Sequence, residues 1–292
     1  MTRFVQRFRL PLILPLLLLT CAALPGLAAA QTSIDQLPVD ETGIPLVARV
    51  NDAPITLPAF QRALARRQFD MAAADPLALE AEVLEQLIDQ VLIGQAAAAQ
   101  DITISDEEVQ AELQINLELA GSPEDWQAWL SLNGYSEAEF IETLRMTLLT
   151  NRVRDLLTAD LSGDVTQVHA RHILVQTEAE AFDLMARLQA GEDFGALAAQ
   201  VSLDDTTARL GGDLGWFVRE ELLVPELADA AFMLSPGQVG GPVRTALGYH
   251  IVQTLESGSR PVEPERRVYI AQARFENWLT SVRQVAIIER YL

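Results

Sequence analysis

The sequence predicts an α+β protein in two parts, a mostly helical N-terminal domain and a smaller domain of alternating strands and helices. Between residues 79 and 99 apolar side chains recur at helical spacing, and three capping boxes follow. After "LSGDVTQ" (161–167), strand-like runs such as "HARHILVQ" alternate with helical segments. We therefore expect a helical domain over 47–163 and an α+β domain with an antiparallel sheet over 164–258.

The first 30 residues have the features of a secretory signal peptide. Three arginines precede an apolar run over 10–24, and Ala28-Ala29-Ala30 precedes Gln31 as a cleavage site. A retained membrane helix is the alternative, because the apolar run approaches the roughly 20 residues of a span. Prolines interrupt that run, which favours cleavage. Cys21 follows Leu-Leu-Thr in a pattern that resembles a lipoprotein box, so a lipid anchor is a further alternative.

Charge and cysteine content restrict the classes of function. The formal net charge is −20, and the leader holds three of the 21 basic residues and no acidic one, so its removal leaves −23. Such an acidic chain argues against nucleic acid or anionic lipid as a partner. Cys21 is the one cysteine, and after cleavage neither a disulfide nor a thiolate nucleophile is possible.

The N-terminal domain begins with a predicted hairpin. Residues 31–46 contain Pro and Gly among polar residues and are predicted to be a flexible leader. "VARVNDAPIT" (47–56) predicts two short strands around an Asn-Asp turn. Amphipathic helices are expected from Leu57 to Phe69 and over 79–99.

Three further helix starts are marked by capping boxes, in which a hydroxyl accepts from a free backbone amide and an acid follows three residues later. The pairs are Ser105 with Glu108, Ser122 with Asp125, and Ser136 with Glu139. The last of these helices is predicted over about 137–157. This domain has no histidine, cysteine or glycine-rich phosphate loop. It is therefore either a helical scaffold or a cradle for unfolded chains.

The C-terminal segment, 259–292, predicts a helix followed by a strand in "VAIIERYL". Its apolar residues must be covered. We expect this segment to pack back on the N-terminal domain, where it would complete the helical layer and the hairpin.

Two of the three histidines head similar strands, His172 in "RHILV" and His250 in "GYHIV". An isolated strand histidine is usually structural or exposed. His169 and His172 form an H-x-x-H pair that could indicate a metal ligand set. Residues i and i+3 of a strand point to opposite faces, so no metal site is expected.

Five motifs in order carry a family resemblance: "ARHILV", "DFGALAAQVSLD", "GGDLGWF", "AFMLSPGQVGGPV" and "GYHIV". Residues 164–258 thereby resemble the parvulin family of peptidyl-prolyl cis-trans isomerases. "VLEQLIDQVLI" and "ITISDEEV" make the helical region similar to the N-terminal chaperone domain of SurA- and PrsA-type foldases. The resemblance implies a four-stranded antiparallel sheet with surrounding helices and an X-Pro groove on one face.

The resemblance also implies site residues. The catalytic positions would be His172, Asp204, Thr245 and His250, with the two rings close together. The substrate-binding positions would be Leu214, Phe217, Leu223 and Leu227 around the proline ring. Alternatives remain for each group: the histidines could be a structural pair, Asp204 could cap the turn before Thr206, and the apolar residues could be core.

The chain departs from the family pattern at several positions. Leu223 and Leu227 stand where Met and Phe are frequent, and Leu247 stands where a small hydroxyl residue is common. These differences put the rate in doubt more than the fold. A long basic loop after the first strand is absent, so no phosphopeptide preference is expected.

The resemblance implies a secreted or periplasmic foldase that isomerises X-Pro bonds in unfolded secreted or outer-membrane chains, with chaperone activity in its helical domain. Isomerisation breaks no covalent bond, so neither a cofactor nor a metal is required. The alternative is a non-catalytic chaperone whose parvulin unit only binds peptide. Intact His172, Asp204 and His250 favour the enzyme.

Overall fold

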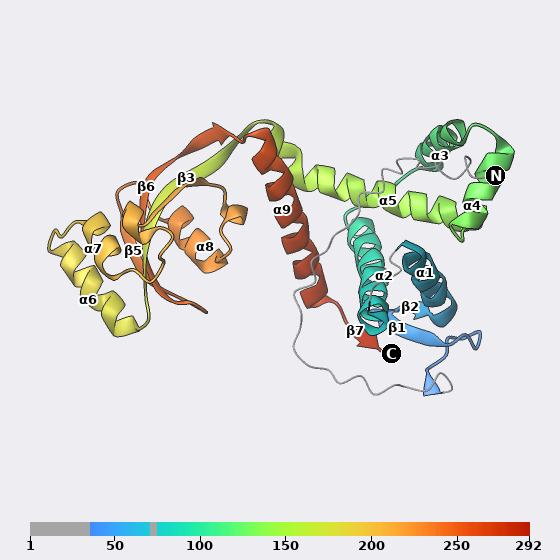
Figure 1. Ribbon diagram of the computed structural model, residues 1–292, viewed down its shortest axis with the longest axis horizontal. Coiled ribbons are helices and arrows are strands. Elements are labelled where there is room, and N and C mark those ends of the chain that lie inside the picture. Colours follow the sequence, from blue (N-terminus) through green and yellow to red (C-terminus); the bar gives the residue numbers. More distant parts are fainter. Residues whose placement is uncertain (1–35, 71–74) are drawn as a thin grey trace. The chain divides into compact units, whose positions relative to one another are not determined.

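The computed structural model describes residues 36–70 and 75–292 and divides into two compact units (Figure 1). The described residues up to 155 form one unit with 278–292, and residues 156–277 form the other. The predicted signal peptide, with Cys21, lies outside the described residues. Within the described ranges, no helix combines the length and the apolar character that crossing a membrane requires.

A three-stranded antiparallel sheet joins the two ends of the first unit. Its order is β2 (Ala53–Thr56), β1 (Leu46–Val50) and β7 (Ile288–Arg290). The predicted β1–β2 hairpin is confirmed, and Asn51 supplies the left-handed residue of its turn at φ 52°. The Asn51 backbone amide donates to Ile287 O (2.7 Å), and the Ile287 amide donates to Asn51 Oδ1 (2.9 Å). The turn therefore also holds the start of β7.

Residues 36–45 differ from the flexible leader expected of them. The Asp40 carboxylate accepts hydrogen bonds from the backbone amides of Thr42 and Ile44 at 2.8 and 2.9 Å. Val39 and Pro45 form an isolated antiparallel bridge, and Leu37 is buried. The Asp40 side chain thus closes an Asx turn, which explains why this polar stretch with Pro and Gly is ordered.

The helices of the first unit follow the predicted pattern. They are α1 (Leu57–Asp70), α2 (Pro76–Ala98), α3 (Asp106–Ala120), α4 (Pro123–Leu132) and α5 (Glu137–Thr158), whose last residues belong to the second unit. Ser105 and Glu108 form the predicted capping box, and the Ser122 and Ser136 hydroxyls accept from the amides three residues on. The core at α4 is aromatic: the Trp126 and Trp129 rings stack with centroids 5.5 Å apart.

Helix α9 (Pro264–Val285) has its last turns in the first unit, where Arg283 makes a buried ion cluster. Its guanidinium lies 2.7 Å from Glu85 and 2.6 Å from Asp89, and Asp89 is only 5% exposed. Arg290, in β7, lies 2.6 Å from the other oxygen of Glu85. The cluster attaches the chain end to α2.

The second unit is built on a four-stranded antiparallel sheet, which confirms the predicted fold class. Its strand order is β4 (Asp213–Phe217), β3 (Asp164–Val175), β6 (Gly248–Pro261) and β5 (Val239–Thr245). The helices around it are α6 (Glu178–Gln189), α7 (Phe194–Val201) and α8 (Pro225–Met233), and short 3-10 turns lie at Ala159–Ser162, Ala208–Leu210 and Arg219–Glu221.

Strand alternation divides the second unit into two cores. Ile173, Val175 and Ile251 pack with apolar residues of α6 and α7. Ala170 and Val252 point to the opposite face and pack with α8. His172 lies two residues from Ala170, and His250 lies two residues from Val252. Both histidines therefore point to the face of the sheet that α8 covers.

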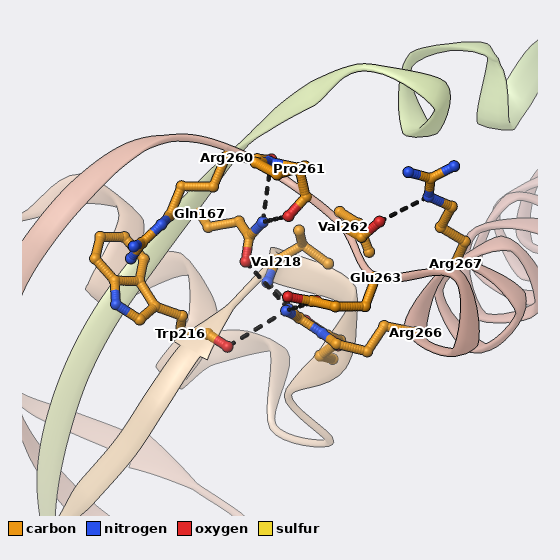
Figure 2. Close-up of polar contacts among 10 residues, drawn as sticks. Gln167, Trp216, Val218, Arg260, Pro261, Val262, Glu263, Arg266 and Arg267 are labelled. Atoms are coloured by element: carbon orange, nitrogen blue, oxygen red, sulfur yellow. Dashed lines mark hydrogen bonds and ion pairs between the residues drawn. The ribbon is translucent and has the colours of Figure 1, made fainter.

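Figure 2 shows a buried polar cluster where β3 and β6 extend beyond the other strands. The Gln167 side chain, 1% exposed, donates to the carbonyl oxygens of Arg260 and Pro261, each at 3.2 Å. The Arg266 guanidinium donates to Gln167 Oε1 (3.2 Å) and to Glu221 (2.6 Å). The start of α9 is therefore attached to the sheet of the second unit by satisfied polar contacts.

Candidate active site

Two buried histidine rings lie on neighbouring central strands with their Nδ1 edges toward each other. Leu174 of β3 pairs with His250 of β6, and His172 pairs with Val252, so the two histidines are diagonal neighbours on one face. Their ring centroids are 5.3 Å apart with an interplanar angle of 14°, and their Nδ1 atoms are 3.1 Å apart. His172 is 4% exposed and His250 1%.

Asp204 closes one end of this pair from the loop after α7. Its Oδ2 lies 2.7 Å from His172 Nε2 and accepts from the Thr207 hydroxyl at 2.5 Å. Its Oδ1 accepts from the Thr206 backbone amide at 3.1 Å. Asp204 therefore caps the turn and contacts the histidine at the same time, so the two interpretations of this residue do not exclude each other.

Thr245 closes the other end, at the tight turn between β5 and β6. Its hydroxyl oxygen lies 3.0 Å from His250 Nε2 and accepts from the Leu247 backbone amide at 3.1 Å. The other acceptor near this hydroxyl, the Gly248 carbonyl, lies farther away at 3.4 Å.

For two neutral rings, the carboxylate at one end determines the direction of every hydrogen bond in the chain. A carboxylate only accepts, so His172 Nε2 carries a proton, and in the neutral ring Nδ1 is then an acceptor. His250 must therefore donate from Nδ1, which leaves its Nε2 to accept from the Thr245 hydroxyl. With both rings neutral, all protons are donated toward Asp204.

The surroundings keep His250 neutral and Asp204 ionised at neutral pH. Burial, together with the neighbouring His172, lowers the pKa of His250 to about 4, so its ring is neutral. Burial alone would raise the pKa of Asp204, but hydrogen bonds from Thr207 and His172 outweigh it and lower that pKa to about 2. Asp204, at one end of the chain, is thus ionised, while His250 is uncharged.

The "GGDLG" motif allows the close approach of the site loop to β3. Gly212 has φ 82°, and its carbonyl accepts from the His172 backbone amide at 2.9 Å. A Cβ at Gly212 would lie 2.1 Å from His172 O. Only glycine meets both requirements, positive φ and close packing, at this position.

The structure brings together four predicted residues, His172, Asp204, Thr245 and His250. Thr207 was missed by sequence reasoning. Its signal was available in retrospect, since a hydroxyl three residues after Asp in a turn commonly hydrogen-bonds that carboxylate.

The four predicted substrate-binding residues do not form a single exposed surface. Phe217 and Leu227 are each 3% exposed and belong to the core beneath α8, with Leu214 partly buried against it. Leu223 is 90% exposed. Phe217 and Leu227 are therefore core residues here, because Leu227 of α8 and Phe217 of β4 belong to one buried apolar cluster. Substrate contact by Leu214 and Leu223 stays a prediction.

The third histidine lies outside this network. His169 Nε2 is 2.7 Å from Asp213 Oδ1, and its ring lies 5.7 Å from that of Trp216. His169 and His172 thus have different carboxylate partners.

Two family models match the chain. Residues 164–256 match the PPIC-type PPIASE domain, and residues 1–154, more than half the chain, match the SurA-like N-terminal domain. The chain belongs to the family with a SurA-like N-terminal domain and carries a PPIC-type domain after it. This confirms the resemblance inferred from the motifs.

Three curated relatives show how far the similarity to this family extends. "Foldase protein PrsA" of Caldanaerobacter subterraneus is 35% identical over 176 residues, covering 59% of this chain and 55% of the relative. The protein of that name from Geobacillus kaustophilus is 31% identical, covering 65% of this chain and 66% of the relative. "Chaperone SurA" of Thiobacillus denitrificans is 34% identical, covering 44% and 34%. The chain thus spans one third to two thirds of the length of these relatives.

Proposed function

We propose that the protein catalyses cis-trans isomerisation of X-Pro bonds in unfolded polypeptides. The observation that carries this proposal is the directed hydrogen-bond chain from Thr245 through His250 and His172 to Asp204. The barrier to be lowered, about 18–20 kcal/mol, arises from amide resonance. No bond breaks, so the site needs groups that favour the twisted amide over the planar one.

Burial assigns different roles to the members of the chain. The Asp204 side chain is 23% exposed, whereas that of His172 is 6% exposed. Asp204 is therefore better placed than the two rings to meet a substrate carbonyl, and the rings act as positioning residues behind it. A planar amide carries partial negative charge on its oxygen, and the twisted amide carries less. A fixed carboxylate near that oxygen consequently disfavours the planar ground state more than the transition state.

The test is NMR exchange spectroscopy on an X-Pro tetrapeptide with the chain from Gln31 to Leu292. We expect the wild type to accelerate exchange between the cis and trans peptide, and Asp204→Ala to abolish most of that acceleration. His169→Ala is the matched control, because it removes a histidine of the same strand that contacts a different carboxylate. A folded wild type without acceleration would contradict the proposal.

A non-catalytic peptide-binding role is the second candidate. It is favoured by the burial of Phe217 and Leu227, which leaves two predicted pocket walls inside the core. Line broadening of the proline resonances without faster isomerisation would support this candidate.

We further propose that the helical part, 47–163, acts as a chaperone domain and that residues 164–258 act as an isomerase domain. Of the C-terminal segment 259–292, residues 278–292 share a compact unit with the helical part, whereas 259–277 belong to the other unit. Support comes from exposed apolar side chains of the first unit; these are Leu77, Ile115, Leu119, Leu132, Val285 and Ile287. A cavity of about 310 Å³ there is lined by apolar side chains of α2 and α9, including Leu92, Val282 and Val285. Suppression of aggregation of an unfolded protein should survive Asp204→Ala if the two activities are separate.

The proposed site of action is outside the inner membrane, in the periplasm or cell envelope, on unfolded secreted or outer-membrane chains. This location rests on the signal-peptide pattern of residues 1–30. Mass spectrometry of the protein expressed with its leader should show a new N-terminus at Gln31. An intact N-terminus, or a lipid on Cys21, would contradict cleavage at that site.

A further inference from the structure

Thr207 contacts both ends of the His172–Asp204 interaction. Its hydroxyl donates to Asp204 Oδ2 at 2.5 Å, and the same hydroxyl oxygen lies 3.2 Å from His172 Nε2. Two donors, Thr207 Oγ1 and His172 Nε2, therefore converge on one carboxylate oxygen.

The backbone of Thr207 joins the same two residues. Its amide donates to the Asp204 carbonyl (3.2 Å), and its carbonyl accepts from the Gly212 amide (2.9 Å). The Gly212 carbonyl in turn accepts from the His172 amide (2.9 Å). Thr207 thus links Asp204, through Gly212, to the backbone of His172 in β3.

We propose that Thr207 is a positioning residue of the isomerase site, whose hydroxyl holds Asp204 Oδ2 in line with His172 Nε2. This inference rests on the proposed function for its catalytic consequence. Asp204 is partly exposed, so water competes for its oxygens. Apart from the imidazole, Thr207 is the side chain that donates to Oδ2, while Oδ1 is held by a backbone amide. Without the hydroxyl, the carboxylate can rotate away from the ring.

The direction of the whole hydrogen-bond chain depends on this alignment. Asp204 selects the Nε2–H form of His172, and that form requires His250 to donate from Nδ1. If the Asp204 carboxylate moves away from His172, neither histidine ring is held in a single tautomer. The expected loss is therefore in the catalytic step and not in peptide binding.

Three substitutions separate the hydroxyl from its surroundings. Thr207→Val is nearly isosteric and removes the donor, whereas Thr207→Ser keeps it. Thr206→Val is the matched control, because Thr206 is exposed and contributes its backbone amide to Asp204. Should Thr207→Val fail to fold, Thr207→Ala removes the same donor without the added methyl group.

Two readouts on the full chain at pH 7.5 test the proposal. The first is kcat and KM for an X-Pro peptide; the second is solvent exchange of the His172 Nε2 proton, followed by NMR of 15N-histidine-labelled protein. For Thr207→Val we expect kcat to fall about three- to tenfold with KM within about twofold, and the ring proton to exchange at least about tenfold faster. Thr207→Ser should restore both values, and Thr206→Val should match the wild type.

The outcomes distinguish this inference from the proposed function. Wild-type exchange rates for the ring proton in Thr207→Val would overturn the positioning role, whatever the activity. If the wild-type chain does not isomerise the peptide, the proposed function fails, and the ring-proton exchange still decides the role of Thr207. A loss of kcat that Thr207→Ser does not restore would also overturn it.

Discussion

His172 and His250 face each other across the two central strands of the second unit, with their Nδ1 atoms 3.1 Å apart. They are separated by 78 residues in the chain, and both are almost completely buried. The neutral imidazole of His250 in this core has a consequence for stability as well as for chemistry.

Acid should destabilise the second unit through His250. Its pKa is about 4 in the folded protein and 6.5 in an unfolded chain, so the unfolded state binds more protons between these values. The stabilisation is complete above pH 6.5 and is lost as the pH falls toward 4. At pH 4.5 we expect a loss of about 2–3 kcal/mol relative to pH 7.5 from this residue. Urea unfolding of the wild type and His250→Gln at both pH values measures it, since the variant should lose less stability. An equal loss in both proteins would contradict the assignment.

Thr245→Val should destabilise the protein by about 1–3 kcal/mol at pH 7.5, because the buried Nε2 of His250 loses its hydroxyl donor. The isomerisation rate should fall as well, since the orientation of His250 is no longer specified. Chemical denaturation and peptide exchange measure the two effects. Thr245→Ser keeps the donor and is the control; if it behaves like Thr245→Val, the methyl group and not the hydroxyl matters.

Gly212→Ala should cost more than about 3 kcal/mol, because its Cβ would meet the His172 carbonyl oxygen at 2.1 Å while φ is positive. Gly215→Ala is the matched control in the same motif, with φ 68° and no atom within 4 Å of the added carbon. It should cost only about 1–2 kcal/mol from backbone strain. Thermal unfolding of the two variants compares them. Equal costs would show that φ alone, and not close packing, explains the glycine.

Arg283→Met should destabilise the first unit by about 3–5 kcal/mol, since it leaves the carboxylate of Asp89 buried without its cation. Burial raises the pKa of Asp89 even with the arginine present, which shows how strongly its charge depends on a partner. Arg187→Met, which breaks the exposed pair with Glu192, should cost less than about 1 kcal/mol. Unfolding followed by tryptophan fluorescence measures both, and adding Asp89→Asn should recover most of the larger loss.

Local signals determined much of this fold. The caps at Ser105 and Ser136 and the Asn51 turn each involve residues within four positions of one another, so the sequence by itself placed those helices and that hairpin. The five motifs that carry the parvulin resemblance implied the four-stranded antiparallel sheet and the site residues.

Tertiary structure decided the rest, because it depends on contacts between distant residues. The hydrogen bonds of His172 reach Asp204 and His250, which are 32 and 78 positions away. The direction of these hydrogen bonds, and the tautomer of each histidine, can be worked out only once the position of the Asp204 carboxylate is known. In the same way, the packing of α8 buried Leu227 while leaving Leu223 exposed, although both are leucines of one short stretch. Local pattern specifies which side chains are apolar or polar, and long-range packing determines which of them reach a substrate.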